Sequence, residues 1–169
     1  GFRPENYKDG YPNPILLPDP AQTEAAASYE DACAFTLFNV DRNIPISLSH
    51  VSTLLFAMAG QIGSKIWPGQ GHFIRCTTPS GGARHPTEVY MAALDVDELT
   101  PGLYHYDVRD HGLSPLSQGN HGVSSIFEVI PDLQDRIHFR PHAIFVLTSL
   151  LERSMWRYRD SRSFRVVLL

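Results

Sequence analysis

Apolar residues recur at the spacing of an amphipathic helix over residues 47–60. They fall on one helical face and are Leu48, Val51, Leu54, Leu55 and Met58. Ser47 stands where its side chain can cap the first turn, and Gly60 stands where such helices end. The pattern therefore predicts a helix over this stretch. A capping-box-like start at Ser28 predicts a shorter helix over 28–38.

Four stretches have the alternating or densely apolar character of β-strands, namely residues 88–96, 103–106, 113–116 and 143–150. The second and third flank Asp110-His-Gly112, so they predict a hairpin with a tight turn. The fourth is almost continuously apolar, which is typical of a central strand that is buried on both faces.

Other stretches are predicted from proline and glycine content or from weaker periodicity. Residues 1–27 are rich in proline and predict an extended N-terminal segment that precedes a domain over 28–169. Residues 60–72 contain glycines and a proline, which indicates a loop. The weaker patterns predict a helix over 124–137 that Pro131 breaks, a helical turn over 152–158 and a further element over 163–169.

Length and composition limit the class of protein. The 169 residues, 43% of them hydrophobic, fit one domain with a real core and exclude disorder as the main state. No apolar stretch is long enough to span a membrane, and the first residues do not resemble a secretory signal. Cys33 and Cys76 form no paired motif, so we expect no disulfide framework and a cytoplasmic protein. Residues 166–169 are apolar and uncapped, from which we expect the domain to be incomplete at its C-terminus.

The net charge of −4 is unevenly distributed. Residues 1–134 carry 7 Lys/Arg against 15 Asp/Glu, and residues 135–169 carry 7 against 3, so that −8 and +4 sum to −4. An acidic protein with one basic end is a poor general nucleic-acid binder, but it can hold a local anion. His138 and His142 have the spacing of zinc ligands on a helix. Pro141 between them opposes a helix there, so we expect no metal site.

The most unusual stretch is Pro79-Ser-Gly-Gly-Ala-Arg-His-Pro86. Its glycines let the backbone approach a ligand and leave N–H groups uncovered, and Ser80 and Arg84 add hydrogen-bond donors. Such a loop suits a flat, electron-rich ligand that carries carbonyl and phosphate groups. An ordinary tight turn before the strand at Glu88 explains the same composition equally well.

Arginines alternate with aromatic residues near the end of the chain. Five arginines, at positions 153, 157, 159, 162 and 165, are interleaved with Trp156, Tyr158 and Phe164. This pattern suits a nucleic-acid strand or an anionic aromatic ligand, although a solvated arginine face is the commoner explanation. Tyr158 is a candidate proton donor or acceptor, because the cations on both sides of it favour release of the phenolic proton.

Three ordered motifs make the chain similar to the SagB-type (McbC-like) branch of the nitroreductase family. The first is the loop over 79–86, and the second is Pro101-Gly-Leu-Tyr-His-Tyr-Asp107 followed by His111-Gly-Leu113. The third is Glu152-Arg-Ser-Met-Trp-Arg-Tyr-Arg-Asp-Ser-Arg-Ser-Phe-Arg165. The resemblance covers about residues 28–169.

The resemblance implies an α+β fold with a mixed β-sheet flanked by helices. It also implies FMN as cofactor, a homodimer or a complex with a second nitroreductase-like chain, and a peptide or small-molecule substrate. Neither nucleic acid nor membrane is an implied partner. The characteristic reaction of the branch is the dehydrogenation of thiazoline and oxazoline rings to azoles.

The chain departs from the family pattern in three places. Phe35-Thr-Leu-Phe-Asn39 stands where the family has the Arg/Ser motif that holds the FMN phosphate, so this role falls to Arg42, Arg75 or Arg84. Arg157 replaces the lysine of a Lys-Tyr pair, and an arginine cannot act as a general base. The family's long core helix after the final apolar run is missing from the sequence.

These motifs lead to a specific hypothesis about the site. Cofactor binding is assigned to Arg75, Ser80, Gly81, Gly82 and Arg84. Catalysis is assigned to Tyr158, which moves the substrate proton, and to Arg157, which orients Tyr158 or binds the peptide. Two alternatives stay open: a nitroreductase-like domain that has lost catalysis and binds a peptide or a partner, and a nucleic-acid binder.

Overall fold

A computed structural model describes residues 5–8, 11–20, 45–69, 71–131 and 141–159. Several sequence-based predictions fall outside these ranges. They are the helix over 28–38, the element over 163–169, the Phe35–Asn39 departure, Arg42 and His138.

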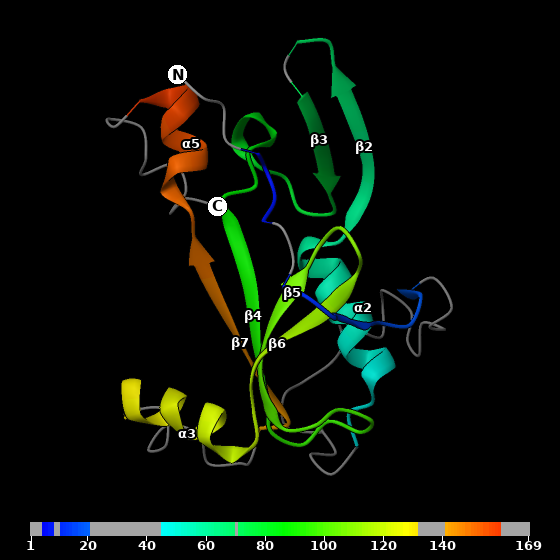
Figure 1. The fold of residues 1–169 in the computed structure, drawn as a ribbon, viewed down its shortest axis with the longest axis vertical. Coiled ribbons are helices and arrows are strands. Elements are labelled where there is room, and N and C mark those ends of the chain that lie inside the picture. The colour runs from blue at the N-terminus through cyan, green and yellow to red at the C-terminus, as the bar shows by residue number, and fades with distance from the viewer. Residues whose placement is uncertain (1–4, 9–10, 21–44, 70, 132–140, 160–169) are drawn as a thin grey trace, which may run out of the picture.

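The centre of the fold is a five-stranded sheet in the order β1-β6-β5-β4-β7 (Figure 1). The strands are β1 (Ile15–Leu16), β4 (Thr87–Ala93), β5 (Gly102–Asp107), β6 (Gly112–Gln118) and β7 (Ala143–Ser149). All four ladders are antiparallel, and β5 and β6 form the predicted hairpin. Because this sheet is combined with helices, the predicted α+β class is confirmed.

The helix predicted over 47–60 is present as α2 (Leu48–Ala59). The Ser47 side chain accepts from the His50 backbone N–H, and the His50 side chain in turn accepts from the Ser47 N–H. Leu48, Val51 and Leu55 are buried as the apolar stripe predicts. The prediction that Leu54 belongs to the same buried stripe is wrong, because its side chain is 48% exposed.

The loop predicted over 60–72 is wrong. This stretch forms an antiparallel ribbon of β2 (Gln61–Trp67) and β3 (Gly71–Cys76), separate from the main sheet. Its glycines serve the ribbon instead of breaking it: Gly69 and Gly71 adopt positive φ at the turn, and Gly63 leaves room for the Arg75 side chain. A high glycine content therefore does not distinguish a loop from two strands joined by a tight turn.

The strand predicted over 143–150 exists as β7, but its predicted central position is wrong. Within the described sheet, β7 pairs with β4 alone and lies at the edge. Its side chains range from half-buried to exposed, so the apolar run does not correspond to burial on both faces. Along the chain, α3 (Asn120–Val129) precedes this strand and ends just before Pro131 as predicted, and α5 (Leu151–Tyr158) follows the strand.

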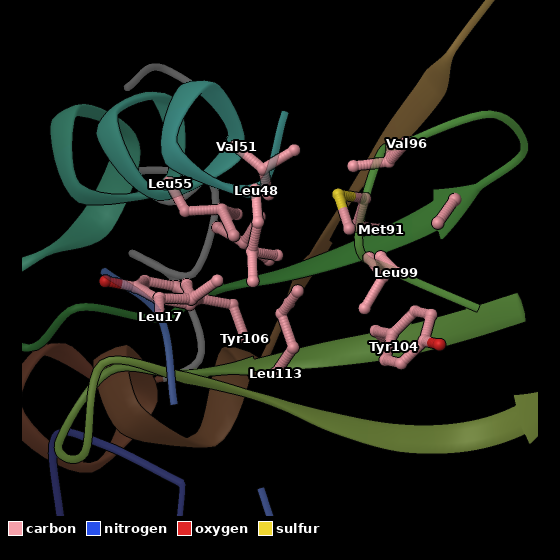
Figure 2. Close-up of a cluster of buried hydrophobic side chains, with 12 residues drawn as sticks. Leu17, Leu48, Val51, Leu55, Met91, Val96, Leu99, Tyr104, Tyr106 and Leu113 are labelled. Atoms are coloured by element: carbon pink, nitrogen blue, oxygen red, sulfur yellow. The ribbon is translucent and has the colours of Figure 1, made fainter. Parts of the chain in front are cut away.

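The core lies between α2 and one face of the sheet (Figure 2). Val51 and Leu55 from the helix meet Met91, Tyr106 and Leu113 from β4, β5 and β6, and all five side chains are fully buried. At one end of the sheet, η3 (Gly81–Ala83) precedes β4 and α5 follows β7. Because Thr87 pairs with Ser149, both lie at the same end (Figure 1).

The N-terminal segment is attached to this core. β1 pairs with β6, and the Ser52 hydroxyl donates to the Pro18 carbonyl oxygen. Since Ser52 uses its proton there, its oxygen accepts from His111 Nε2 at 2.8 Å, which leaves His111 Nδ1 to accept from the Tyr106 hydroxyl. The chain of hydrogen bonds thus links the segment through α2 to β5. The division at residue 27 stays a prediction.

No helix within the described ranges is both long enough and apolar enough to cross a membrane.

Candidate functional site

The loop over 79–86 is a closed turn held by its own hydrogen bonds. The Ala83 N–H donates to the Ser80 carbonyl oxygen at 3.0 Å, and the His85 N–H donates to the Ser80 hydroxyl oxygen at 2.9 Å. Gly82, Ala83 and His85 all have positive φ, at 66°, 51° and 41°. Such a conformation is unfavourable for Ala and His, so the surrounding structure must stabilise it.

Tyr158, at the end of α5, reaches this loop. A Cβ atom added at Gly82 would collide with the Tyr158 hydroxyl. The absence of a side chain at Gly82 therefore makes room for Tyr158. At Gly81, by contrast, a Cβ would meet no atom of the described residues within 4 Å, so these residues leave this part of the loop open to a ligand.

A buried ion pair joins the loop to the sheet and to α5. Arg153 Nη1 lies 2.5 Å from Glu88 Oε1 and donates to the His85 carbonyl oxygen at 2.7 Å. The other carboxylate oxygen of Glu88 lies 2.8 Å from His105 Nε2. Glu88, His105 and Arg153 are each at most 4% exposed. Buried charges require partners of this kind, so the network holds three elements in one arrangement.

Arg84 strengthens the same junction from beneath the loop. Its side chain is 1% exposed, and its Nε donates to the Arg153 carbonyl oxygen at 2.9 Å. The guanidinium carbon lies 5.2 Å from the Trp156 ring centre and 5.9 Å from that of Phe73, within the range of cation–π contacts. Arg84 thus fastens α5 and β3 to the loop.

A cavity of about 320 Å³ opens on the Ser80 and His85 side of the loop. Apolar side chains dominate its wall, and the polar groups come from the loop, from the buried ion pair and from the N-terminal segment. Its lining includes Asn6, Tyr7, Ile74, Cys76, Pro79, Ser80, His85, Glu88, Val108, Leu147 and Arg153. A mostly apolar cavity with few convergent polar groups is typical of a small-molecule or cofactor site.

Two lining residues have shifted pKa values. Burial, together with the charges of Arg153 and Arg84, lowers the pKa of His85, so its imidazole is neutral near pH 7. Burial, assisted by the Glu88 carboxylate, raises the pKa of Cys76 to about 11. The cavity therefore presents a neutral imidazole and a protonated thiol, and its Glu88 and Arg153 charges compensate each other.

The fold is similar to that of a solved protein. The structure of an Anabaena variabilis protein assigned to the nitroreductases superposes with a TM-score of 0.64 and 22% sequence identity. The match covers 96% of this chain and 29% of that protein. The chain has a nitroreductase-like fold.

The chain is also similar in sequence to a curated protein. The trifolitoxin-processing protein TfxB of Rhizobium leguminosarum bv. trifolii is 35% identical over 124 residues. The match covers 72% of this chain and 33% of TfxB, so the chain spans about a third of the length of that relative. No family model matches the chain.

The nitroreductase-like fold brings together only some of the residues that the sequence singled out. Ser80 lines the cavity, and Gly82 meets Tyr158 at the tip of the loop. Arg84 lies beneath the loop, outside the cavity lining. Arg75 lies over Gly63 on the β2–β3 ribbon, and its neighbours in β3 face the cavity in its place.

Arg157 lies in α5, but its side chain is outside the part of the chain that can be described. The assigned roles of all seven residues stay predictions.

Sequence reasoning missed several residues of the site. The sequence pattern predicts Glu88 only as the start of a strand, although a carboxylate beside the apolar run of β4 signals a buried partner. It places Arg153 in the arginine–aromatic stretch, which suits an anionic ligand or a solvated face, and the partner of Arg153 is evident only in three dimensions. Asn6 gave no signal, because it lies in a proline-rich stretch that composition describes as an extended tail.

Proposed function

We propose that the chain is part of a peptide-modifying oxidoreductase that binds FMN against the loop over 79–86 and dehydrogenates azoline rings. The nitroreductase-like fold and the similarity to a trifolitoxin-processing protein support an oxidoreductase role in peptide modification. The observation that carries the proposal is the convergence of the loop with Tyr158, two features that the sequence selected independently.

The described residues fit the ring of a flavin. The space in front of Gly81 is open, and the cavity beside Ser80 offers an apolar wall with few polar groups. Ser80 and the neutral imidazole of His85 supply hydrogen bonds suited to the carbonyl and nitrogen edge of the ring. FMN, when bound, supplies a two-electron acceptor for hydride.

The described cavity lining offers no unneutralised cation for the phosphate of FMN. Arg153 is the one arginine or lysine among the described cavity-lining residues, and Glu88 already neutralises it. Arg84 is committed to the junction beneath the loop. We therefore assign the phosphate to Arg42 or Arg75, which remain of the three arginines that the family comparison suggests for this role.

In this proposal Tyr158 transfers the proton that the substrate releases. Conversion of an azoline to an azole removes a hydride from one ring carbon and a proton from the adjacent ring carbon. The Tyr158 hydroxyl, which lies against Gly82, relays this proton: its oxygen accepts the proton from the ring carbon while its own phenolic proton passes to solvent. Arg157, next to it in α5, orients the phenol or binds the peptide.

The experiment is single-turnover reduction of FMN by a thiazoline-containing peptide. Tyr158→Phe removes the hydroxyl and keeps the ring, so we expect it to retain FMN and to slow reduction by about 10²-fold. Arg157→Lys is the matched control and is expected to reduce FMN at an equal or higher rate. Reduction as fast in Tyr158→Phe as in the parent would show that Tyr158 only packs against the loop.

A catalytically inactive domain that binds a peptide or partner is the second candidate. The compensated charges of the described cavity lining favour it, because a phosphate needs an available cation. The two candidates differ in one property: the second binds no flavin.

A further inference from the structure

Asn6 makes three side-chain hydrogen bonds near the site, and it comes from the N-terminal segment, far from the loop in sequence. Its side chain is fully buried. The carboxamide nitrogen donates to the Ile74 carbonyl oxygen at 2.9 Å and to the Ala83 carbonyl oxygen at 3.0 Å. The carboxamide oxygen accepts from the Ile74 N–H at 3.2 Å. Both N–H groups of the amide and its acceptor are therefore used.

These bonds join β3 to the strained part of the loop. Through Ile74, Asn6 pairs with the backbone of β3 as a neighbouring strand would. Through its second N–H it holds the carbonyl group of Ala83, whose φ of 51° is unfavourable for alanine. One buried side chain thus fixes the peptide between Ala83 and Arg84, one residue beyond Gly82, against which Tyr158 lies.

The residue next to Asn6 extends the same contact into the cavity. Asn6 and Tyr7 both line its wall, and the Tyr7 ring packs edge-on against His72 with 6.2 Å between ring centres. The segment is anchored separately by Lys8, whose amino group donates to the hydroxyl groups of Tyr11 and Tyr90 at 2.9 and 3.1 Å. The segment thus has one anchor at the loop and another on β4.

We propose that Asn6 is a positioning residue for the loop over 79–86 and that the N-terminal segment thereby completes the flavin site. This inference rests on the proposed function for its consequence, because the loop shape matters to a ligand only if flavin binds there. The effect of Asn6 on the loop shape does not depend on flavin: without its N–H donors, the carbonyl groups of Ile74 and Ala83 lose these partners and the positive φ at Ala83 loses one of its supports.

The first test measures the loop without any flavin. Hydrogen–deuterium exchange of the backbone amides in 79–86 is compared in the parent chain, in Asn6→Ala and in Lys8→Met. Lys8→Met is the matched control, because it releases the same segment at its other anchor without touching the loop. We expect exchange in the loop to be about tenfold faster in Asn6→Ala, and nearly unchanged in Lys8→Met.

Equal exchange in all three proteins, or an equal increase in both variants, would overturn the positioning role. In the second case Asn6 would merely anchor the segment. If Asn6→Ala does not fold, Asn6→Ser replaces it, because a hydroxyl is too short to reach both carbonyl groups and keeps the site polar.

The second test measures FMN affinity by quenching of flavin fluorescence. Asn6→Ala is expected to weaken FMN binding by about tenfold relative to Lys8→Met. Unchanged affinity in a variant with a loosened loop would overturn the link between Asn6 and the site. Failure of the parent chain to bind FMN would instead reject the proposed function, and the exchange experiment would still decide the role of Asn6.

Discussion

The hydroxyl group of Tyr158 lies where a side chain at Gly82 would begin. The two residues come from α5 and η3. Arg153 of α5, which is paired with Glu88, donates to the His85 carbonyl oxygen just after η3, and Arg84 donates to the Arg153 carbonyl oxygen, so these bonds hold the two elements together. Glycine is required at this position twice over, by the positive φ of 66° and by the close approach of the phenol. The loop and the catalytic candidate are thus one structural unit.

The first prediction separates these two requirements. Gly82→Ala is expected to lower the free energy of unfolding by about 2 kcal/mol, because it combines unfavourable φ with the collision at Tyr158. Combining it with Tyr158→Phe, which removes the colliding oxygen, is expected to recover about 1 kcal/mol in a double-mutant cycle. The free energies are measured by denaturation with urea.

Gly69→Ala is the control that measures the cost of the positive φ alone. Gly69 has a nearly identical φ of 70°, and a Cβ there would meet no atom of the described residues within 4 Å. We expect it to cost about 1 kcal/mol, less than Gly82→Ala. Equal losses at both glycines, with no coupling to Tyr158→Phe, would mean that Tyr158 does not contact Gly82 in solution.

The second prediction concerns the buried ion pair. Glu88→Gln leaves the Arg153 guanidinium buried without a counter-charge, so we expect it to lower the free energy of unfolding by about 3 kcal/mol. Glu128→Gln, at an exposed position of α3, is the control and is expected to change it by less than about 0.5 kcal/mol. A loss below about 1 kcal/mol for Glu88→Gln would contradict the described network.

The third prediction concerns pH. Burial lowers the pKa values of His85 and of His111 in the folded state below 6.5, the ordinary value. As the pH falls through 6.5, the unfolded chain therefore takes up protons that the folded chain does not, and the free energy of unfolding decreases. The decrease continues until the pH passes the lowered pKa values of the folded state.

His111→Gln isolates one of these two contributions. The glutamine amide can still donate to Ser52 and accept from Tyr106, but it does not titrate. We expect denaturation curves recorded between pH 7.5 and pH 5 to show a smaller loss of stability in this variant than in the parent chain. An identical pH dependence would assign the effect to other groups.

Local patterns in the sequence predicted much of the fold. Ser47 and the stripe of Val51 and Leu55 predicted α2, and the turn before Gly112 predicted the β5–β6 hairpin, because capping and tight turns depend on neighbouring residues. The edge position of β7 was not predictable in this way. It depends on which strands lie beside it, and the apolar character of a short run does not determine this.

The candidate site likewise contains features that the local sequence predicts and contacts that it does not. The composition of the loop and the position of Tyr158 were visible in the sequence, and the fold brings them together. The partners of Glu88 and the role of Asn6 were not, because each contact joins segments that are distant along the chain. A buried amide or carboxylate becomes recognisable only when its partners are known.

The most direct test of the account is the visible absorption spectrum of the chain after incubation with FMN and removal of free flavin. We expect the parent chain and Tyr158→Phe to retain flavin absorption, and Gly81→Val to lose most of it without a change in its thermal unfolding midpoint. Among the described residues nothing lies within 4 Å of a Cβ at Gly81, so a valine there is expected to obstruct a ligand without disturbing the protein. A parent chain that retains no flavin, or a Gly81→Val chain that retains as much as the parent, would contradict the placement of FMN against this loop.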